Sequence, residues 1–206
     1  MSTFHIQRLD SLSNEAVEKT AQLFTDCFMQ ELCTSLRIPP HSMAKTFSHS
    51  FVKDHYFVCM EGETILGIGA VSTLHGRSHR LDKNWLRREL GYIRGGFVYN
   101  AMREELEHPL PLTAHQAYIE SIATAEHARG KGVATTLMNF LMGTHSHHEF
   151  ILEVMDRNEK AIRLYEHLGF TVFRKKKAGF FLRLGGIRER IYMLKRNENH
   201  TITGNE

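Results

Sequence analysis

The stretch from Tyr118 to Phe170 constrains the fold most, because strand and helix patterns alternate there in close order. Residues 118–123 and 150–155 are short apolar runs, as in strands that are covered on both faces. Between them, aliphatic residues recur at every fourth position from Val133 to Leu141, which is the spacing of a helix with one buried stripe. The stretch therefore predicts a strand, helix, strand crossover.

The joint between the first strand and this helix reads Arg129-Gly130-Lys131-Gly132-Val133-Ala134. Glycine lacks the Cβ that keeps a ligand away from the backbone, and the first turn of a helix offers unpaired N–H groups. A hydrogen bond from such a group to a charged phosphate oxygen contributes on the order of 1.5 to 3 kcal/mol. The joint therefore suits a diphosphate, although two glycines before a helix also form ordinary tight turns.

Neither common nucleotide motif describes this joint. The P-loop pattern G-x-x-x-x-G-K-[ST] does not occur in the chain. The dinucleotide pattern G-x-G-x-x-G is matched by its first two glycines only, because Thr135 stands in the third place. Residues 124–128 also separate the strand from the glycines, although Glu153 lies at about the distance of the ribose-binding acid.

A second motif follows the second strand, over residues 158–170. It begins with helix-capping chemistry, either Asn158 or the pair Asp156 and Glu159, and it ends at Gly169, a common helix stop. The apolar face of this short helix comprises Ala161, Ile162, Tyr165 and Leu168. The Tyr165 phenol is therefore expected to point into the core or into a cleft within it.

Together the two motifs resemble those of the GNAT superfamily of acetyl-CoA-dependent N-acetyltransferases. The phosphate loop of that family, [R/Q]-x-x-G-x-[G/A], is matched by Arg129, Gly132 and Ala134. Its next motif is matched by Asn158, Ala161, Leu164, Tyr165, Gly169 and Phe170. The resemblance is strong over about residues 115–196, and residues 1–114 are only compatible in pattern.

The resemblance implies a single α/β (α+β) domain over residues 1–196. Its sheet should be mixed, mostly antiparallel and twisted, with helices on both faces and a parallel central pair that splays to hold acetyl-CoA. The remaining patterns predict strands at 4–9, 56–60, 64–74, 171–177, 180–184 and 189–194. They predict helices from about 17 to 31 and from 43 to 52, a helical insertion at about 81–108 interrupted at Gly95-Gly96, and a disordered polar tail at 197–206.

The resemblance also implies site residues. Acetyl-CoA is expected to contact Ile122, Ala123, Thr124, Arg129, Gly130, Lys131, Gly132, Val133, Ala134, Asn158 and Tyr165. The Tyr165 hydroxyl is expected to lie beside the sulfur as general acid, because a phenol of pKa about 10 stays protonated at neutral pH. A backbone N–H near Ile122 or Ala123 is expected to hold the oxyanion.

The acceptor amine needs a base, because an ammonium of pKa about 10.4 is almost fully protonated at pH 7. Glu120 is the candidate, since a carboxylate within the central strand is out of character unless it faces a wet cleft. The alternative is an outward glutamate on a half-exposed strand. In the family, the first helix pair frames the acceptor groove, so Phe28, Glu31 and Cys33 are candidates to touch substrate. Otherwise Phe28 belongs to the core and Glu31 to solvent.

We therefore expect an enzyme that transfers an acetyl group to a primary amine by direct attack in a ternary complex. The motif region contains no cysteine that could carry the acyl group. A small amine, a peptide N-terminus, a protein lysine and an antibiotic amine are all open as acceptors. The alternative is a non-catalytic acyl-CoA-binding regulatory module. Nucleic acid is a weaker alternative partner: residues 171–196 hold nine Lys or Arg against one acid, which usually marks a guarded edge strand.

Composition places further bounds on the chain. The net charge of +3 does not by itself indicate nucleic acid, and no apolar run is long enough to span a membrane. Three cysteines without metal spacing favour a reducing, cytoplasmic compartment. We expect no metal, because His145, His147 and His148 fit an exposed turn. The helical insertion is expected to cover the acceptor site, to form a homodimer surface, or simply to pack over the sheet.

Overall fold

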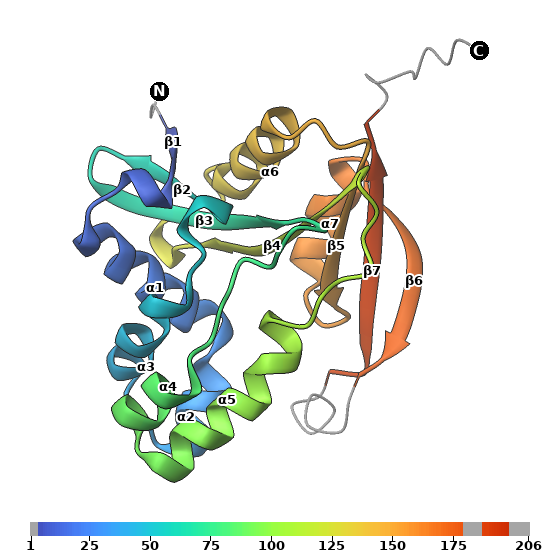
Figure 1. Ribbon diagram of the computed structural model, residues 1–206. Helices are drawn as coiled ribbons and strands as arrows, with labels where there is room; N and C mark the ends of the chain where they lie inside the picture. The colour runs from blue at the N-terminus through green and yellow to red at the C-terminus, as the bar shows by residue number, and fades with distance from the viewer. Residues whose placement is uncertain (1–3, 179–186, 198–206) are drawn as a thin grey trace.

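The computed structural model describes residues 4–178 and 187–197, which form a seven-stranded sheet in the order β1-β2-β3-β4-β5-β7-β6 (Figure 1). The strands are β1 (His5–Arg8), β2 (Tyr56–Glu61), β3 (Thr64–Ser72), β4 (Gln116–Thr124), β5 (Glu149–Met155), β6 (Thr171–Lys177) and β7 (Glu189–Arg196). Among these seven described strands, only β4 and β5 pair in parallel, and the other neighbours are antiparallel. The predicted mixed, mostly antiparallel sheet with a parallel central pair is confirmed.

Helices cover both faces of the sheet, as predicted (Figure 1). They are α1 (Asn14–Phe28), α2 (Gln30–Leu36), α3 (Pro40–Phe47), α4 (Lys83–Leu90), α5 (Tyr92–Leu106), α6 (Val133–Thr144) and α7 (Glu159–His167). Short 3₁₀ turns are η1 (Leu9–Ser11), η2 (Ser48–Ser50), η3 (Lys53–His55) and η4 (Glu126–Ala128). The first five helices share one buried cluster with Val58 and Ile68, and the last two share another with Leu66 and Ile119.

The parallel pair separates halfway along its length. Pairing runs from Gln116 with Glu149 to Ile119 with Leu152, but β4 continues to Thr124 and β5 to Met155. The remainder of β4 stays paired with β3, so the two halves of the sheet diverge beyond Ile119 (Figure 1). The predicted splay between the central strands is confirmed.

A β-bulge in β4 accompanies the separation. Ile68 pairs with Ala123 and Ala70 with Glu120, so Gly69 of β3 faces two residues of β4. One of these is Ser121, whose φ of 58° is unusual for a residue with a side chain. A Cβ on Gly69 would lie 2.6 Å from the Ile122 side chain, so the bulge needs a glycine opposite it.

The first helical region differs from the prediction. The pattern from 17 to 31 forms two helices, because the backbone breaks at Met29 between α1 and α2. The helix predicted at 43–52 instead begins at Pro40 and ends at Phe47. Proline fits the first helical position, where no N–H is required, so the two prolines mark the start of the helix and not a loop before it.

The helical region before β4 is interrupted at a different residue from the one predicted. The interruption lies at Gly91, with φ 85°, and not at Gly95-Gly96, which lie inside α5. A Cβ on Gly95 would overlap the Leu86 carbonyl and lie 2.6 Å from the Arg87 Cα. Gly95 is therefore required by the close approach of α4 to α5.

The predicted C-terminal strands 171–177 and 189–194 are confirmed as β6 and β7. β6 is an edge strand whose residues are all exposed, as expected for a lysine-guarded edge. The strand predicted at 180–184 lies outside the described residues, as does the predicted tail beyond Asn197. Within the described ranges, no helix is both long and apolar enough to cross a membrane.

Candidate active site

The predicted anion loop connects η4 to the start of α6. Gly130 and Gly132 have φ values of 75° and 81°, in the left-handed region that favours glycine. Gly132 is the N-cap of α6, and no side chain caps the N–H groups of the first turn. Arg129 and Lys131 beside them are exposed. The loop therefore presents open donors and positive charge, which fit a diphosphate.

The end of α1 lies within electrostatic range of this loop. Burial raises the pKa of the Cys27 thiol, and the Arg129 guanidinium partly opposes that shift. Next to Cys27, Phe28 is 47% exposed, so the alternative that placed it in the core is wrong. Glu31 is also exposed, on α2, but Cys33 is buried in the core and is not available to a substrate.

Polar side chains support the bulge in β4. The Tyr56 hydroxyl lies 3.0 Å from the Ser121 Oγ and 2.6 Å from the His79 Nε2, and the His79 Nδ1 lies 2.9 Å from the Ser50 Oγ. Burial lowers the pKa of His79 to about 4, so the imidazole is neutral at neutral pH. The chain of contacts therefore ties Ser121 to a buried, uncharged histidine.

The expectation that Glu120 faces a wet cleft is wrong. Its side chain is 11% exposed and accepts hydrogen bonds from Arg77 at 2.7 Å, from the Ser78 hydroxyl at 2.7 Å and from the Ser72 hydroxyl. Burial favours a higher pKa, but the Arg77 charge and the hydrogen bonds outweigh it, so the pKa of Glu120 lies below its usual value. A carboxylate engaged in this way is a poor proton acceptor.

Tyr165 lies on α7 in the same buried cluster as Ala128 and Val133, which flank the anion loop. The Asn158 side chain caps α7 by accepting a hydrogen bond from the Ala161 N–H, which confirms the first of the two predicted caps. Burial raises the pKa of Tyr165 to about 12, so the phenol stays protonated at neutral pH. Among the described residues, nothing hydrogen-bonds to its hydroxyl, which is therefore available.

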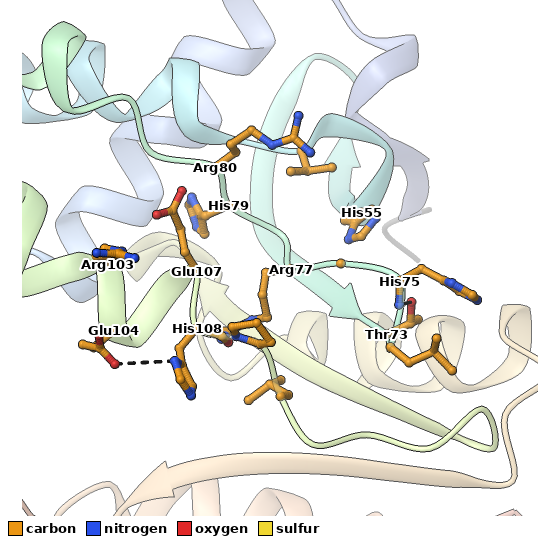
Figure 2. Close-up of a pocket in the computed structure, with 15 residues that line it drawn as sticks. His55, Thr73, His75, Arg77, His79, Arg80, Arg103, Glu104, Glu107 and His108 are labelled. Atoms are coloured by element: carbon orange, nitrogen blue, oxygen red, sulfur yellow. Dashed lines mark hydrogen bonds and ion pairs between the residues drawn. The ribbon is translucent and has the colours of Figure 1, made fainter.

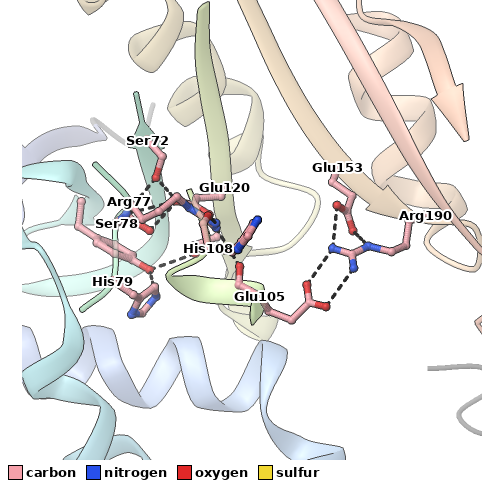
Figure 3. A network of polar contacts seen from close by, with 11 residues as sticks. Ser72, Arg77, Ser78, His79, Glu105, His108, Glu120, Glu153 and Arg190 are labelled. Carbon is pink, nitrogen blue, oxygen red and sulfur yellow. Dashed lines mark hydrogen bonds and ion pairs between the residues drawn. The ribbon is translucent and has the colours of Figure 1, made fainter. Parts of the chain in front are cut away.

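The structure contains a second polar network, which the sequence did not predict (Figure 3). The Arg190 guanidinium of β7 pairs with Glu153 of β5 and with both carboxylate oxygens of Glu105 on α5, at 3.0 and 2.8 Å. Arg77 donates to the Glu105 carbonyl at 2.9 Å, which joins this network to Glu120. Glu153 within an apolar strand was a usable signal of a buried ion pair, but nothing in the sequence pointed to Glu105 as its neighbour.

The loop between β3 and α4 and the end of α5 enclose a cavity of about 550 Å³ (Figure 2). Arg77 lines this cavity, together with His55, His75, Arg80 and Arg103. In Figure 2, the Glu104 carboxylate lies 3.6 Å from the His108 Nδ1 beside the cavity. The cavity is thus polar and lies on the α5 side of the buried Arg77–Glu120 pair.

The histidine turn is more buried than predicted. His145, His147 and His148 are half-buried, and the His145 Nδ1 lies 2.9 Å from the Leu141 carbonyl oxygen. The rings of His145 and His147 are 6.2 Å apart. No group of three or more potential metal ligands occurs within residues 4–178 and 187–197.

Known acetyltransferases resemble this chain in sequence. Residues 17–170 match the Acetyltransferase (GNAT) family. Over 100 residues the chain is 30% identical to the 5-NmdU N-acetyltransferase of Pseudomonas phage PaMx11. That stretch covers 48% of this chain and 65% of the phage protein, which is slightly less than two thirds of its length.

Solved structures resemble the chain in fold. An N-acetyltransferase from Staphylococcus aureus Mu50 superposes with a TM-score of 0.60 at 19% identity, covering 93% of this chain and all of the other. The protein yncA of Salmonella typhimurium, solved with its cofactor acetyl-CoA, gives a TM-score of 0.55 at 12% identity over 100% of both chains. The sheet order, the anion loop before α6 and the family match over most of the chain lead to one conclusion: the chain belongs to the GNAT family of acetyltransferases.

Proposed function

We propose that this protein transfers an acetyl group from acetyl-CoA to a primary amine, with both substrates bound together. The observation that carries the proposal is the conjunction of an uncapped helix start behind Gly132 with a parallel ladder that ends at Ile119 and Leu152. The first feature suits a diphosphate. The second leaves the β4 backbone beyond Ile119 without a β5 partner, so an extended pantetheine arm would pair with it as an added strand does.

Different residues would perform the separate steps of acetyl transfer. Acetyl-CoA would supply the activated acyl carbon and a thiolate leaving group. The Tyr165 hydroxyl holds the proton that this thiolate needs, since its pKa of about 12 keeps it protonated. Backbone N–H groups beside the bulge, near Ile122 and Ala123, would stabilise negative charge on the acyl oxygen. Thr124 and Asn158 remain predicted contacts of the cofactor.

Glu120 has a different role in this proposal from the one expected. Its oxygens are occupied by Arg77 and two serine hydroxyls, and its pKa is lowered. We therefore assign Glu120 to positioning: it orients Arg77, which in turn holds the carbonyls of Glu105 and His108 at 2.9 and 2.7 Å. The amine would lose its proton to water and not to this carboxylate.

The acceptor remains a primary amine of open identity. The phage relative is named for 5-NmdU, so this compound joins small amines, peptide N-termini and lysine side chains as a candidate. Phe28 and Glu31 keep their predicted place at the acceptor side, supported by the exposure of both residues. A cytoplasmic location is supported by three free cysteines, and a homodimer by exposed Tyr92, Ile93 and Phe97 on α5.

The decisive experiment measures release of free thiol from acetyl-CoA with a panel of primary amines. The Tyr165→Phe variant should bind coenzyme A with nearly unchanged affinity in calorimetry and transfer acetyl roughly 10²-fold more slowly. Binding of acetyl-CoA without turnover on any amine would favour the alternative, a non-catalytic acyl-CoA-binding regulatory module. Failure of the wild-type protein to bind coenzyme A would overturn both hypotheses, the acetyltransferase and the binding module.

A further inference from the structure

The cavity between the β3–α4 loop and the end of α5 has two arginines without partners on its walls (Figure 2). Arg80 comes from the loop and Arg103 from α5, and both residues are exposed. In the described part of the chain, neither guanidinium makes a hydrogen bond, an ion pair or a ring contact. A guanidinium carries five N–H donors and no acceptor, so the cavity holds a surplus of donors.

The acids of the same cavity are engaged elsewhere. Glu107 accepts a hydrogen bond from the Leu81 N–H at 2.5 Å, and the Glu104 carboxylate lies 3.6 Å from the His108 Nδ1. Neither acid forms an ion pair with an arginine of the cavity within residues 4–178 and 187–197. The surplus of donors is therefore not used up by the acids beside it.

The net charge of the cavity is small. Three arginines and two acids line it, which leaves a formal charge of +1 with the histidines neutral. Glu120, which pairs with Arg77 behind the wall, reduces this charge to zero. Glu105 does not line the cavity, and its carboxylate is held by Arg190. A ligand would thus be selected by hydrogen bonds to the unpaired guanidinium groups and not by net charge.

Two buried nitrogens on the wall also lack a hydrogen-bond partner among the described residues, the Arg77 Nε and the His55 Nδ1. The Arg77 side chain is 8% exposed, and its terminal nitrogens donate to Glu120 and to the carbonyls of Glu105 and His108. A buried donor without an acceptor destabilises the fold. A negative charge in the cavity would offset part of this cost.

We propose that this cavity binds a small molecule through a phosphate group held by Arg80 and Arg103. One guanidinium fork can pair both oxygens of a carboxylate, whereas the oxygens of a phosphate point in several directions and can accept from two arginines at once. This site is separate from the anion loop before α6, because none of residues 129–134 lines the cavity.

The cavity has room for more than the phosphate. Its volume of about 550 Å³ falls in the range of roughly 300 to 1,000 Å³ that is usual for small-molecule sites. Arg80 also lines a neighbouring cavity of about 660 Å³ at the start of α4. The two cavities therefore meet at one of the proposed phosphate ligands, and the rest of the molecule can extend into either.

Calorimetry with glycerol 3-phosphate tests the site, both alone and with saturating coenzyme A, which occupies the anion loop if that loop binds the diphosphate. Arg80→Gln and Arg103→Gln should each weaken binding by about tenfold or more, because each removes charged hydrogen bonds to the phosphate. Glycerol, which lacks the phosphate, should not bind.

The matched control is Arg94→Gln. Arg94 is an exposed arginine of the same helix as Arg103, it makes no contact with other described residues, and it lies outside the cavity. This variant removes one positive charge from α5 and should bind glycerol 3-phosphate as tightly as the wild-type protein.

Two sources share this chemistry, an acceptor amine that carries a phosphate and a separate phosphate compound. The first source rests on the proposed acetyl transfer, and kinetics distinguish the two. If the acceptor carries the phosphate, kcat/KM for O-phosphoethanolamine should exceed that for ethanolamine by about tenfold or more, and Arg80→Gln should remove this advantage. If the phosphate compound is separate, the two amines should react alike, and glycerol 3-phosphate should compete with neither.

Three results would contradict the inference. They are no binding of glycerol 3-phosphate, binding that Arg80→Gln and Arg103→Gln leave intact, and an equal loss in the Arg94→Gln variant. Binding that disappears when coenzyme A is added would place the phosphate in the anion loop and would also contradict it. Absence of transfer to every amine is distinct, because it would overturn the proposed acetyl transfer and leave this binding site standing.

Discussion

At the scale of single residues, the backbone conformation of Gly132 has the most direct consequence. A Cβ at Gly132 would meet no protein atom within 4 Å, so crowding does not explain the glycine. The φ of 81° explains the glycine, because placing a residue with a side chain in the left-handed region costs about 1 kcal/mol or more in conformational free energy. If the loop binds the diphosphate, as proposed, the same Cβ would also stand close to the anion at the first N–H groups of α6.

We therefore predict that Gly132→Ala weakens coenzyme A binding by about tenfold or more, measured by calorimetry, while the protein stays folded. Gly143→Ala is the matched control, because Gly143 lies in the same helix with open space around it and no positive φ. It should bind coenzyme A normally and be slightly more stable. Equal affinity of the two variants would show that the loop does not hold the diphosphate.

Glu120 gives a second prediction at this scale. Glu120→Gln leaves the buried Arg77 without its counter-charge, so we expect a loss of about 3 to 5 kcal/mol in the free energy of unfolding. Urea denaturation at neutral pH measures this loss. Glu159→Gln, which breaks the exposed pair with Arg163 on α7, should cost less than about 1 kcal/mol. A small effect at Glu120 would mean that water, not Arg77, balances its charge.

At the scale of elements, the contact between α4 and α5 depends on a glycine that sequence reasoning assigned to a break. Alanine at Gly95 would gain up to about 1 kcal/mol in helix propensity but would meet the backbone of Leu86 and Arg87, which cannot move without separating the helices. We predict a net destabilisation of about 1 to 3 kcal/mol for Gly95→Ala in thermal or urea unfolding.

The neighbouring glycine provides the control. At Gly96 the nearest atoms are those of the Arg87 guanidinium, at 3.4 Å or more, and this flexible group can shift. Gly96→Ala should therefore be neutral or stabilising. If both variants are destabilised equally, α5 does not pack on α4 through Gly95.

How far sequence reasoning reaches differs between elements. The β4–α6–β5–α7 order was predictable, because the apolar spacing, the Gly132 N-cap and the Asn158 cap all act within a few residues. The bulge at Ser121 was not, because serine has no preference for positive φ and only the facing Gly69 makes room for it. The partners of Glu120 were also hidden, since Arg77 lies 43 residues away in a loop without a motif.

At the scale of the whole molecule, the candidate site is built from segments that the fold brings together from distant parts of the chain. Arg77 precedes α4, Glu105 ends α5, Glu153 lies in β5 and Arg190 in β7, and their contacts connect both halves of the splayed sheet (Figure 3). Geometry at the acceptor side therefore depends on the stability of the whole fold. An acidic pH that protonates buried groups should therefore lower the stability of the fold and disturb the geometry of the acceptor side together.

The pH dependence of stability follows from His79. Its folded pKa, about 4, lies below the usual 6.5, so the unfolded chain binds this proton more readily. The contribution to stability is fully present above pH 6.5 and is lost as the pH falls towards 4, by about 3 kcal/mol in total. Glu120, whose pKa is lowered, adds a loss in the same direction at the acidic end of this window, below its usual value of about 4.5.

Urea unfolding at a series of pH values between 7.5 and 4, in steps of about half a unit, separates these two groups, because the Glu120 contribution is lost only below about pH 4.5. Burial also lowers the pKa of His147, so the contribution of His79 is isolated by comparing the wild-type protein with a His79 variant. We expect His79→Gln to be less stable than the wild-type protein at pH 7, since it disturbs the contacts with Ser50 and Tyr56, yet to lose less stability between pH 6.5 and 5. Parallel curves for the two proteins would mean that His79 is not held neutral by burial. Converging curves would establish that the support of the Ser121 bulge also makes the fold acid-sensitive.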